Sequence, residues 1–201
     1  MAIAMKDLEI RGAGNLLGGE QSGHIADVGF DLYVRLVGEA VADFRGDEVE
    51  EDEDVRIELP VDAHLPHDYV SSERLRLEMY KRLSEVRTDA DVDEIRAELV
   101  DRYGTPPDVV ESLLVVARFR ARARAAGLKD VAVAGKNVRF APVSLPDSRQ
   151  VRMARLYPKS KVHSQLDAML VPRPLAKDKA SGIALLEWAR GVIDQIVDPV
   201  S

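Results

Sequence analysis

The chain has 201 residues, of which 46% are hydrophobic and 31% are charged, with a net charge of -7, a balance ordinary for a globular domain with an appendage. It contains no cysteine, which excludes disulfides and thiolate metal sites. No apolar run approaches the roughly 20 residues of a membrane-spanning helix and no signal-peptide pattern opens the chain, so we expect a cytoplasmic protein without a membrane partner.

The N-terminal part is predicted to be helical with a glycine-rich interruption. Residues 2–10 resemble the end of a helix, and the run 12–23 contains five glycines, which favour tight turns. Residues 26–45 predict a long helix that ends near Gly46, because apolar side chains recur on one helical face. That face consists of Val28, Leu32, Tyr33, Leu36, Val37, Ala40, Val41 and Phe44.

An acidic run separates this part from the rest of the chain. Seven of the eight residues in 47–54 are Asp or Glu, and like charges repel one another and keep such a run extended. We therefore expect an N-terminal appendage over 1–46, a linker over 47–54 and a main domain over 55–201.

The main domain is predicted to begin with one strand and three helices. Residues 55–59 alternate apolar and charged side chains, which is typical of a half-buried strand. The helices are expected over 73–87, 92–103 and 107–126. Ser71 or Ser72 can cap the first helix, and Asp91 with Glu94 predicts a capping box for the second.

The remaining sequence mixes strands and helices. Residues 131–133 and 138–140 flank Gly135, which predicts a β-hairpin. The later elements are expected as a short helix between Pro146 and Pro158, strands over 161–165 and 168–171, and a last helix over about 179–197. This order favours an α+β fold, with about five helices and a small, mostly antiparallel sheet in the main domain.

The most specific motif lies at residues 6–23. It reads Lys-Asp-Leu-Glu-Ile-Arg-Gly-Ala-Gly-Asn-Leu-Leu-Gly-Gly-Glu-Gln-Ser-Gly. Its third glycine is one position too late for a dinucleotide-binding fingerprint, and no buried strand precedes it. The whole string resembles the translocation motif shared by the RecG helicase and transcription-repair coupling factor (Mfd) families. The resemblance places Arg11 and Gln21 at the arginine and glutamine positions of that motif, with Gly12 and Gly14 between them.

Motifs further along the chain favour the coupling-factor family over RecG. They are Val-Arg-Ile-Glu-Leu-Pro at 55–60, Leu65-Pro66-x-Asp68-Tyr69-Val70, Arg74-Leu75 with Tyr80-Lys81-Arg82-Leu83, and Asp101-Arg102-Tyr103-Gly104-x-Pro106-Pro107. The resemblance is specific over residues 2 to about 127 and looser beyond. It implies that the chain is the C-terminal region of such a protein, the tail of its motor followed by the C-terminal domain.

The resemblance also implies a function. In this family the C-terminal domain packs on the N-terminal UvrB-like module and masks the surface that recruits the repair protein UvrA, until the protein engages RNA polymerase and translocates on duplex DNA. ATP and Mg serve the family's motor. Because this chain has no Gly-x-x-x-x-Gly-Lys-Ser/Thr motif, we expect no cofactor and no ATP turnover in it.

A duplex-DNA-binding accessory domain is the alternative. Residues 106–173 contain 13 basic and 5 acidic side chains, and such an excess can attract phosphate or an acidic protein surface. The candidate contacts with nucleic acid or a partner are Arg118, Arg122 and Arg124. Alternating arginines lie on two sides of a helix, however, so a solvated helix flank is the commoner explanation.

No catalytic or metal-binding constellation is expected. His64 and His67, with Asp62 and Asp68, provide only two imidazoles on a proline-containing loop, which is weak support for a metal site. A surface loop leading into a helix explains them better. The sequence has no cysteine nucleophile and no serine in a nucleophile-elbow motif.

Overall fold

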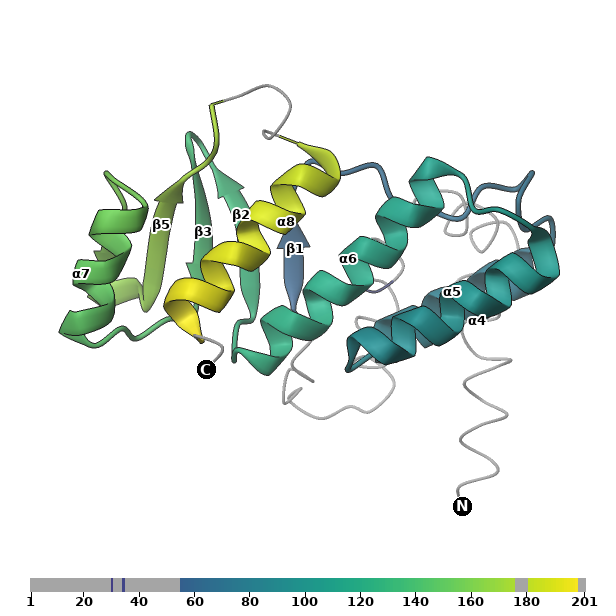
Figure 1. Ribbon diagram of the computed structural model, residues 1–201, viewed down its shortest axis with the longest axis horizontal. Coiled ribbons are helices and arrows are strands. Elements are labelled where there is room, and N and C mark those ends of the chain that lie inside the picture. The colour runs from purple at the N-terminus through teal and green to yellow at the C-terminus, as the bar shows by residue number, and fades with distance from the viewer. Residues whose placement is uncertain (1–29, 31–33, 35–54, 176–180, 199–201) are drawn as a thin grey trace, which may run out of the picture.

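The computed structural model describes residues 30, 34, 55–175 and 181–198. Within these residues, five α-helices and a five-stranded sheet form an α+β domain (Figure 1). The predicted fold class of the main domain is therefore confirmed. The predicted linker and, apart from Phe30 and Val34, the predicted appendage lie outside the described residues.

The sheet has the strand order β1-β2-β3-β5-β4. Its strands are β1 (Arg56–Glu58), β2 (Asp130–Ala134), β3 (Asn137–Ala141), β4 (Lys161–His163) and β5 (Ala168–Pro172). Only β1 and β2 pair in parallel, and the other neighbours are antiparallel. A single row of partners runs across all five strands through Ile57, Val131, Phe140, Met169 and Val162. The first four are buried, so this row marks the core face of the sheet.

The helices form two groups around α6. The elements are α4 (Glu73–Glu85), α5 (Asp89–Tyr103), α6 (Asp108–Ala125), α7 (Asp147–Leu156), the short 3-10 helix η1 (Ser164–Leu166), and α8 (Gly182–Val192), which continues as the π-helical turn η3 (Ile193–Val197). Figure 1 shows α8 crossing the sheet with α6 beside it, and α4 and α5 on the far side of α6. Helix α7 lies at the other end of the molecule.

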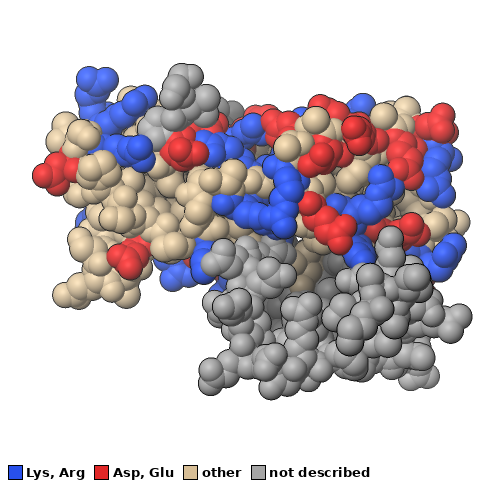
Figure 2. All heavy atoms as spheres, turned by 90° about the horizontal axis from the view of Figure 1, so that it is seen from below, with Lys and Arg blue, Asp and Glu red and all other residues tan. Residues whose placement is uncertain are grey.

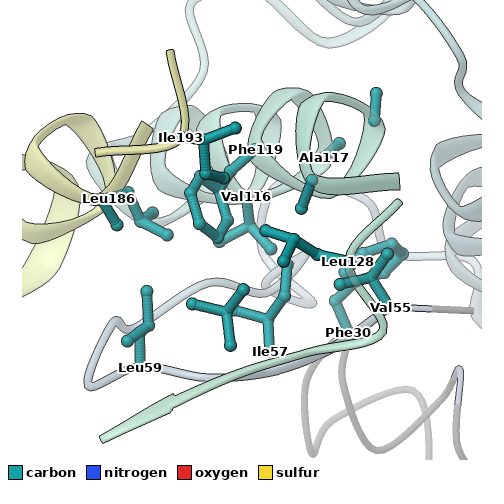
Figure 3. Close-up of a cluster of buried hydrophobic side chains, with 14 of the residues drawn as sticks. Phe30, Val55, Ile57, Leu59, Val116, Ala117, Phe119, Leu128, Leu186 and Ile193 are labelled. Carbon is teal, nitrogen blue, oxygen red and sulfur yellow. The ribbon is translucent and has the colours of Figure 1, made fainter. Parts of the chain in front are cut away.

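The core is centred on α6. Half of its residues are buried, namely Val110, Leu113, Leu114, Val116, Ala117, Phe119, Arg120, Ala121 and Ala123. Figure 3 shows Val116 and Phe119 in one cluster with Ile57 of β1, Leu186 of α8 and Ile193 of η3. Helix α6 therefore packs between the sheet side of the domain, with α8, and the helices α4 and α5.

Most predicted element bounds agree with the structure to within two residues. The hairpin of β2 and β3 turns at Gly135, which adopts a φ of 62° that glycine allows without steric cost. Three bounds differ from the prediction, among them the start of α5, which was expected at residue 92 and lies at Asp89. The strand expected over 161–165 ends at His163 and gives way to η1, and the last helix begins at Gly182 rather than near 179.

The capping box of α5 lies three residues earlier in the chain than predicted. The helix begins at Asp89, and its N-cap is Thr88 rather than Asp91. The Thr88 Oγ1 accepts a hydrogen bond from the Asp91 backbone N–H at 3.2 Å, and the Asp91 carboxylate accepts one from the Thr88 backbone N–H at 2.8 Å. Asp91 is thus the third residue of the helix, where its carboxylate satisfies a backbone N–H group left free by the first turn.

We expect Thr88→Ala to lower the free energy of unfolding by about 1 kcal/mol, because the substitution removes the oxygen that accepts from the first turn of α5. Urea unfolding followed by circular dichroism measures the change. Thr88→Ser is the matched control, since it keeps the hydroxyl and is expected to retain most of the stability. Equal losses in the two variants would contradict the role assigned to this oxygen.

Candidate interaction site

Two of the three arginines predicted as contacts form ion pairs inside the domain. Arg118 of α6 pairs with Asp93 of α5. The Arg122 Nε donates to Asp194 at 2.6 Å, and its Nη1 donates to Asp198 at 2.9 Å. Burial alone would lower the pKa of Arg122, but its hydrogen bonds to the two carboxylates outweigh burial and raise the pKa. Arg122 therefore holds the end of η3 against α6.

The other two arginines of α6 point in different directions. Arg124 donates to the carbonyl oxygens of Val86 at 3.0 Å and Ser84 at 3.4 Å, which closes the C-terminal end of α4. Arg120 is only 3% exposed, and its Cζ lies 5.2 Å from the centroid of the Phe30 ring. Such a position over an aromatic face favours a cation.

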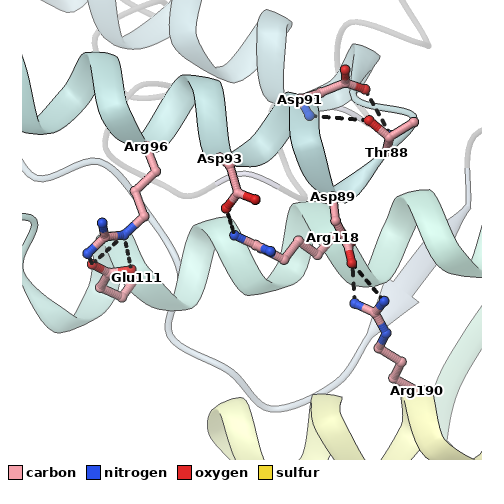
Figure 4. A network of polar contacts seen from close by, with 8 residues as sticks. All are labelled: Thr88, Asp89, Asp91, Asp93, Arg96, Glu111, Arg118 and Arg190. Atoms are coloured by element: carbon pink, nitrogen blue, oxygen red, sulfur yellow. Dashed lines mark hydrogen bonds and ion pairs between the residues drawn. The ribbon is translucent and has the colours of Figure 1, made fainter.

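Ion pairs also connect α5 with its neighbours (Figure 4). Arg96 of α5 forms a two-pronged contact with Glu111 of α6, and Arg190 of α8 donates to Asp89 at 2.9 Å. The hydrogen bond from Arg190 holds the pKa of Asp89 below its ordinary value. These contacts join α5, α6 and α8 through charges that are distant in the sequence.

Phe30 connects the predicted appendage to the core of the main domain. Its side chain is 1% exposed, and its ring centroid lies 5.9 Å from that of Tyr80 on α4. The Tyr80 hydroxyl in turn accepts a hydrogen bond from the Leu65 backbone N–H at 2.8 Å. Phe30, which comes from the stretch predicted as a long helix, is therefore part of the core of the domain that follows.

Four other basic side chains of the stretch 106–173, on α7 and β4 and between them, have no such partners among the described residues. We define the α7–β4 surface by the basic residues Arg152, Arg155, Lys159 and Lys161 and the apolar residues Val151, Leu156 and Leu166. All seven are exposed, and the four basic side chains make no ion pair or hydrogen bond with any described residue. Figure 2 shows many blue and red side chains intermixed at the α4–α5 end, whereas the α7 end is mostly tan with separate blue groups and a few red ones.

Residues 106–173 form one basic stretch in the sequence, but the structure divides their side chains into two groups. The arginines of α6 are engaged within the domain, and so is Arg149 of α7, which donates to the Val197 carbonyl oxygen, whereas Arg152 and Arg155 of α7 are exposed without such a partner among the described residues. The proposed contacts at Arg118, Arg122 and Arg124 remain a prediction, and a partner would have to compete with their present carboxylates and carbonyls. The alternation of the α6 arginines hinted at this, since it placed them on two sides of the helix.

The other sequence-predicted residues give no site in the described part of the chain. Arg11, Gly12, Gly14 and Gln21 lie outside it. Among the described residues, no group of three or more His, Cys, Asp or Glu side chains could hold a metal ion. His64 instead has its Nδ1 2.9 Å from a carboxylate oxygen of Asp62. No described helix combines the length and apolar character needed to cross a membrane.

Comparison with known proteins identifies the domain. Its five-stranded sheet, crossed by α8, and its helix α6, which lies between α8 and the pair α4 and α5, define an α+β domain. The TRCF domain family matches residues 59–152. The crystal structure of a transcription-repair coupling factor C-terminal domain has the same fold, with a TM-score of 0.54 at 20% identity over 70% of this chain and 93% of that chain.

The relatives by sequence give the family. The transcription-repair-coupling factors of Mycobacterium bovis and Mycobacterium tuberculosis are 52% identical over 188 residues, which is 88% of this chain. That of Bacillus subtilis is 42% identical over 123 residues. The chain belongs to the transcription-repair coupling factor family, as its motifs indicated. It spans about 15% of the length of the mycobacterial relatives.

We expect Arg122→Met to lower the free energy of unfolding by about 2 kcal/mol, because it leaves Asp194 and Asp198 without their charged donor. Arg152→Met is the matched control, since the same change on the solvent face of α7 is expected to stay within about 0.5 kcal/mol. Urea unfolding measures both. Similar losses in the two variants would show that the ion pairs of Arg122 do not stabilise the domain.

Acid pH is expected to weaken the links between the helices. Hydrogen bonds from Arg190 and Arg82 hold the pKa values of Asp89 and Glu98 below their ordinary values of 3.8 and 4.5. Because the unfolded chain takes up these protons first, their contribution to stability is complete above the ordinary values and is lost as pH falls below them. Urea midpoints measured from about pH 6 to pH 3 are expected to fall.

A double variant tests whether protonation of Asp89 and Glu98, rather than of other carboxylates, causes the loss of stability at acid pH. Asp89→Asn with Glu98→Gln is expected to lose stability near neutral pH and to show a shallower decline at acid pH. Glu94→Gln, at an exposed position of α5 without an ion pair among the described residues, is the control and is expected to follow the parent curve. A double variant that keeps the full acid dependence would contradict the assignment.

Proposed function

We propose that this chain is the C-terminal interaction portion of a transcription-repair coupling factor that takes part in transcription-coupled DNA repair. The observation that carries this proposal is the family match, with 52% identity over 88% of the chain. By the family resemblance, the whole protein is an ATP-dependent translocase on duplex DNA. Arg11, Gly12, Gly14 and Gln21 would belong to its translocation motif, while ATP and Mg would bind in motor lobes outside this chain.

Within that protein, the domain over 55–201 is an autoinhibitory module. It packs on the N-terminal UvrB-like module and masks the surface that recruits UvrA, and it is released when the protein engages RNA polymerase and moves along DNA. The ion pairs that join α5, α6 and α8 support this role. They make the domain a preorganised body, which can dock and leave as a unit without a cost for ordering its own elements.

Binding in trans tests this proposal. The ¹⁵N-labelled chain is titrated with the isolated N-terminal UvrB-like module of the same protein, and chemical-shift changes are expected on one contiguous face. The affinity is expected to be weak, because separating the modules removes the effective concentration that a tether provides. Added UvrA should displace the chain, since both occupy one surface of the module.

Two results would contradict the proposal. The first is the absence of shifts at about 1 mM module, a concentration typical of a short flexible tether. The second is a ternary complex in which UvrA and this chain occupy the N-terminal module together, because masking requires competition. An unrelated acidic protein of similar size serves as the control for non-specific attraction to the basic side chains.

Duplex-DNA binding is the second candidate function. The four basic side chains of the α7–β4 surface, exposed and without partners among the described residues, are the observation in its favour. Contacts through α6 would instead require Arg118, Arg122 and Arg124 to give up their intramolecular partners. A DNA-binding role therefore depends on α7 and β4 rather than on α6.

A further inference from the structure

The α7–β4 surface mixes positive charge with exposed aliphatic side chains. Val151 and Leu166 are each 71% exposed, and Leu156 is 40% exposed. Single exposed aliphatic residues are normal on a protein surface. Here, however, they occur together with basic residues on α7 and on η1, next to β4. None of the four basic side chains forms an ion pair or hydrogen bond with a described residue.

Helical spacing places these side chains next to each other. Val151 and Arg155 are four residues apart on α7, and so are Arg152 and Leu156. Residues four apart on a helix are neighbours on its surface, so two adjacent rows each contain one apolar and one basic side chain, and the row of Val151 and Arg155 begins with the exposed Asp147. The buried residue of α7 is Met153, which fixes the opposite side of the helix against the domain.

Strand β4 extends this surface along the edge of the sheet. It pairs only with β5, so one of its sides has no neighbouring strand among the described residues. Lys161 is exposed at its start, and η1 places the exposed Leu166 shortly after its end. The same pattern of a basic and an apolar side chain therefore continues from the helix onto the sheet edge.

The chemistry of this surface favours a protein partner over a nucleic acid. Phosphate groups would satisfy the basic residues but offer nothing apolar to Val151, Leu156 and Leu166. Surfaces that bind single strands generally provide stacking aromatics, whereas the aromatic residue next to α7, Tyr157, is half-buried with its ring edge-on to Trp188 at 6.2 Å. Carboxylates alternating with apolar side chains would satisfy both kinds of residue.

The acidic run of this same chain is a poor occupant for geometric reasons. Residues 47–54 directly precede β1, which forms the opposite edge of the sheet from β4. Four strand spacings separate the two edges, or about 19 Å. At about 3.6 Å per residue at most, a run of eight residues spans at most about 29 Å, so only its first few residues could cover that distance. A segment with several carboxylates at this surface is therefore better supplied by another polypeptide.

We propose that the α7–β4 surface binds an acidic, partly apolar segment of another protein chain. Carboxylates of that segment pair with Arg152, Arg155, Lys159 and Lys161, and its apolar side chains cover Val151, Leu156 and Leu166. This inference is independent of the autoinhibitory role, because it concerns a binding surface and makes no use of the N-terminal module.

Peptide binding to the full 201-residue chain tests the proposal. The probe is a fluorescein-labelled helical peptide with glutamate and leucine on one face. One control peptide has glutamine in place of each glutamate, and the other has serine in place of each leucine. Fluorescence anisotropy should show binding of the first peptide, weakening with added salt, and much weaker binding of both controls.

Substitutions in the chain locate the site. Arg152→Glu with Arg155→Glu is expected to lower the affinity at least about tenfold, because like charges then face each other. Val151→Ser with Leu166→Ser is expected to lower it about fivefold through lost apolar burial. Arg74→Glu with Arg87→Glu is the matched control, with the same charge change at exposed arginines on and just after α4, and should bind like the parent.

A 20-base-pair DNA duplex tests the alternative that the α7–β4 surface binds nucleic acid. If the duplex binds more tightly than the acidic peptide, and the Val151→Ser/Leu166→Ser variant binds it normally, the surface is a nucleic-acid site and the proposal is overturned. No binding of the peptide at low salt also overturns it. Unchanged circular dichroism of each variant confirms that the fold is intact, and Arg152→Gln with Arg155→Gln provides a milder second variant.

Discussion

The domain depends on the burial of α6 between its two halves. One side of the helix packs with α8, η3 and the sheet, and the other with α4 and α5. A helix buried on two sides leaves little room for its charged residues, so long arginine side chains extend to its margins and find partners on neighbouring elements. The ion pairs of Arg118 and Arg122 are therefore a consequence of how α6 is packed, and they also fix the position of α5 and η3.

Phe30, which precedes the main domain in the sequence, also depends on the position of α6, because its ring contacts Arg120 of that helix. A guanidinium that is 3% exposed loses most of its hydration, and an aromatic face supplies part of the lost stabilisation. Phe30 provides that face and also packs on Tyr80. Any movement that withdrew Phe30 would expose apolar surface and leave Arg120 without its aromatic neighbour. Phe30 and the domain that follows it are thus energetically coupled.

Helices, strands and turns that depend on residues near one another in the sequence could be predicted. Contacts between residues far apart in the sequence could not. The alternation in 55–59, the turn at Gly135 and the prolines around α7 are local signals, and the structure confirms each element. The ion pairs are different. Arg122 and Asp194 are 72 residues apart, and Arg190 and Asp89 are 101 apart, so no spacing reveals them. Phe30 is not among the residues predicted for the apolar face of 26–45, although it lies three residues before Tyr33 and seven before Val37 and so falls on that face. The local pattern could have indicated its burial, but not its neighbours Tyr80 and Arg120.

The division of charge between α6 and α7 bears on how this domain can bind and release a partner. Charges already paired within the domain contribute little to association, because a partner gains only the difference between the new contact and the one it replaces. Charges in solvent steer an approaching partner and lose their effect as salt rises. A small surface that mixes such charges with a few aliphatic side chains lacks the extensive apolar area of a permanent interface. The α7–β4 surface therefore suits contacts that form quickly and separate again.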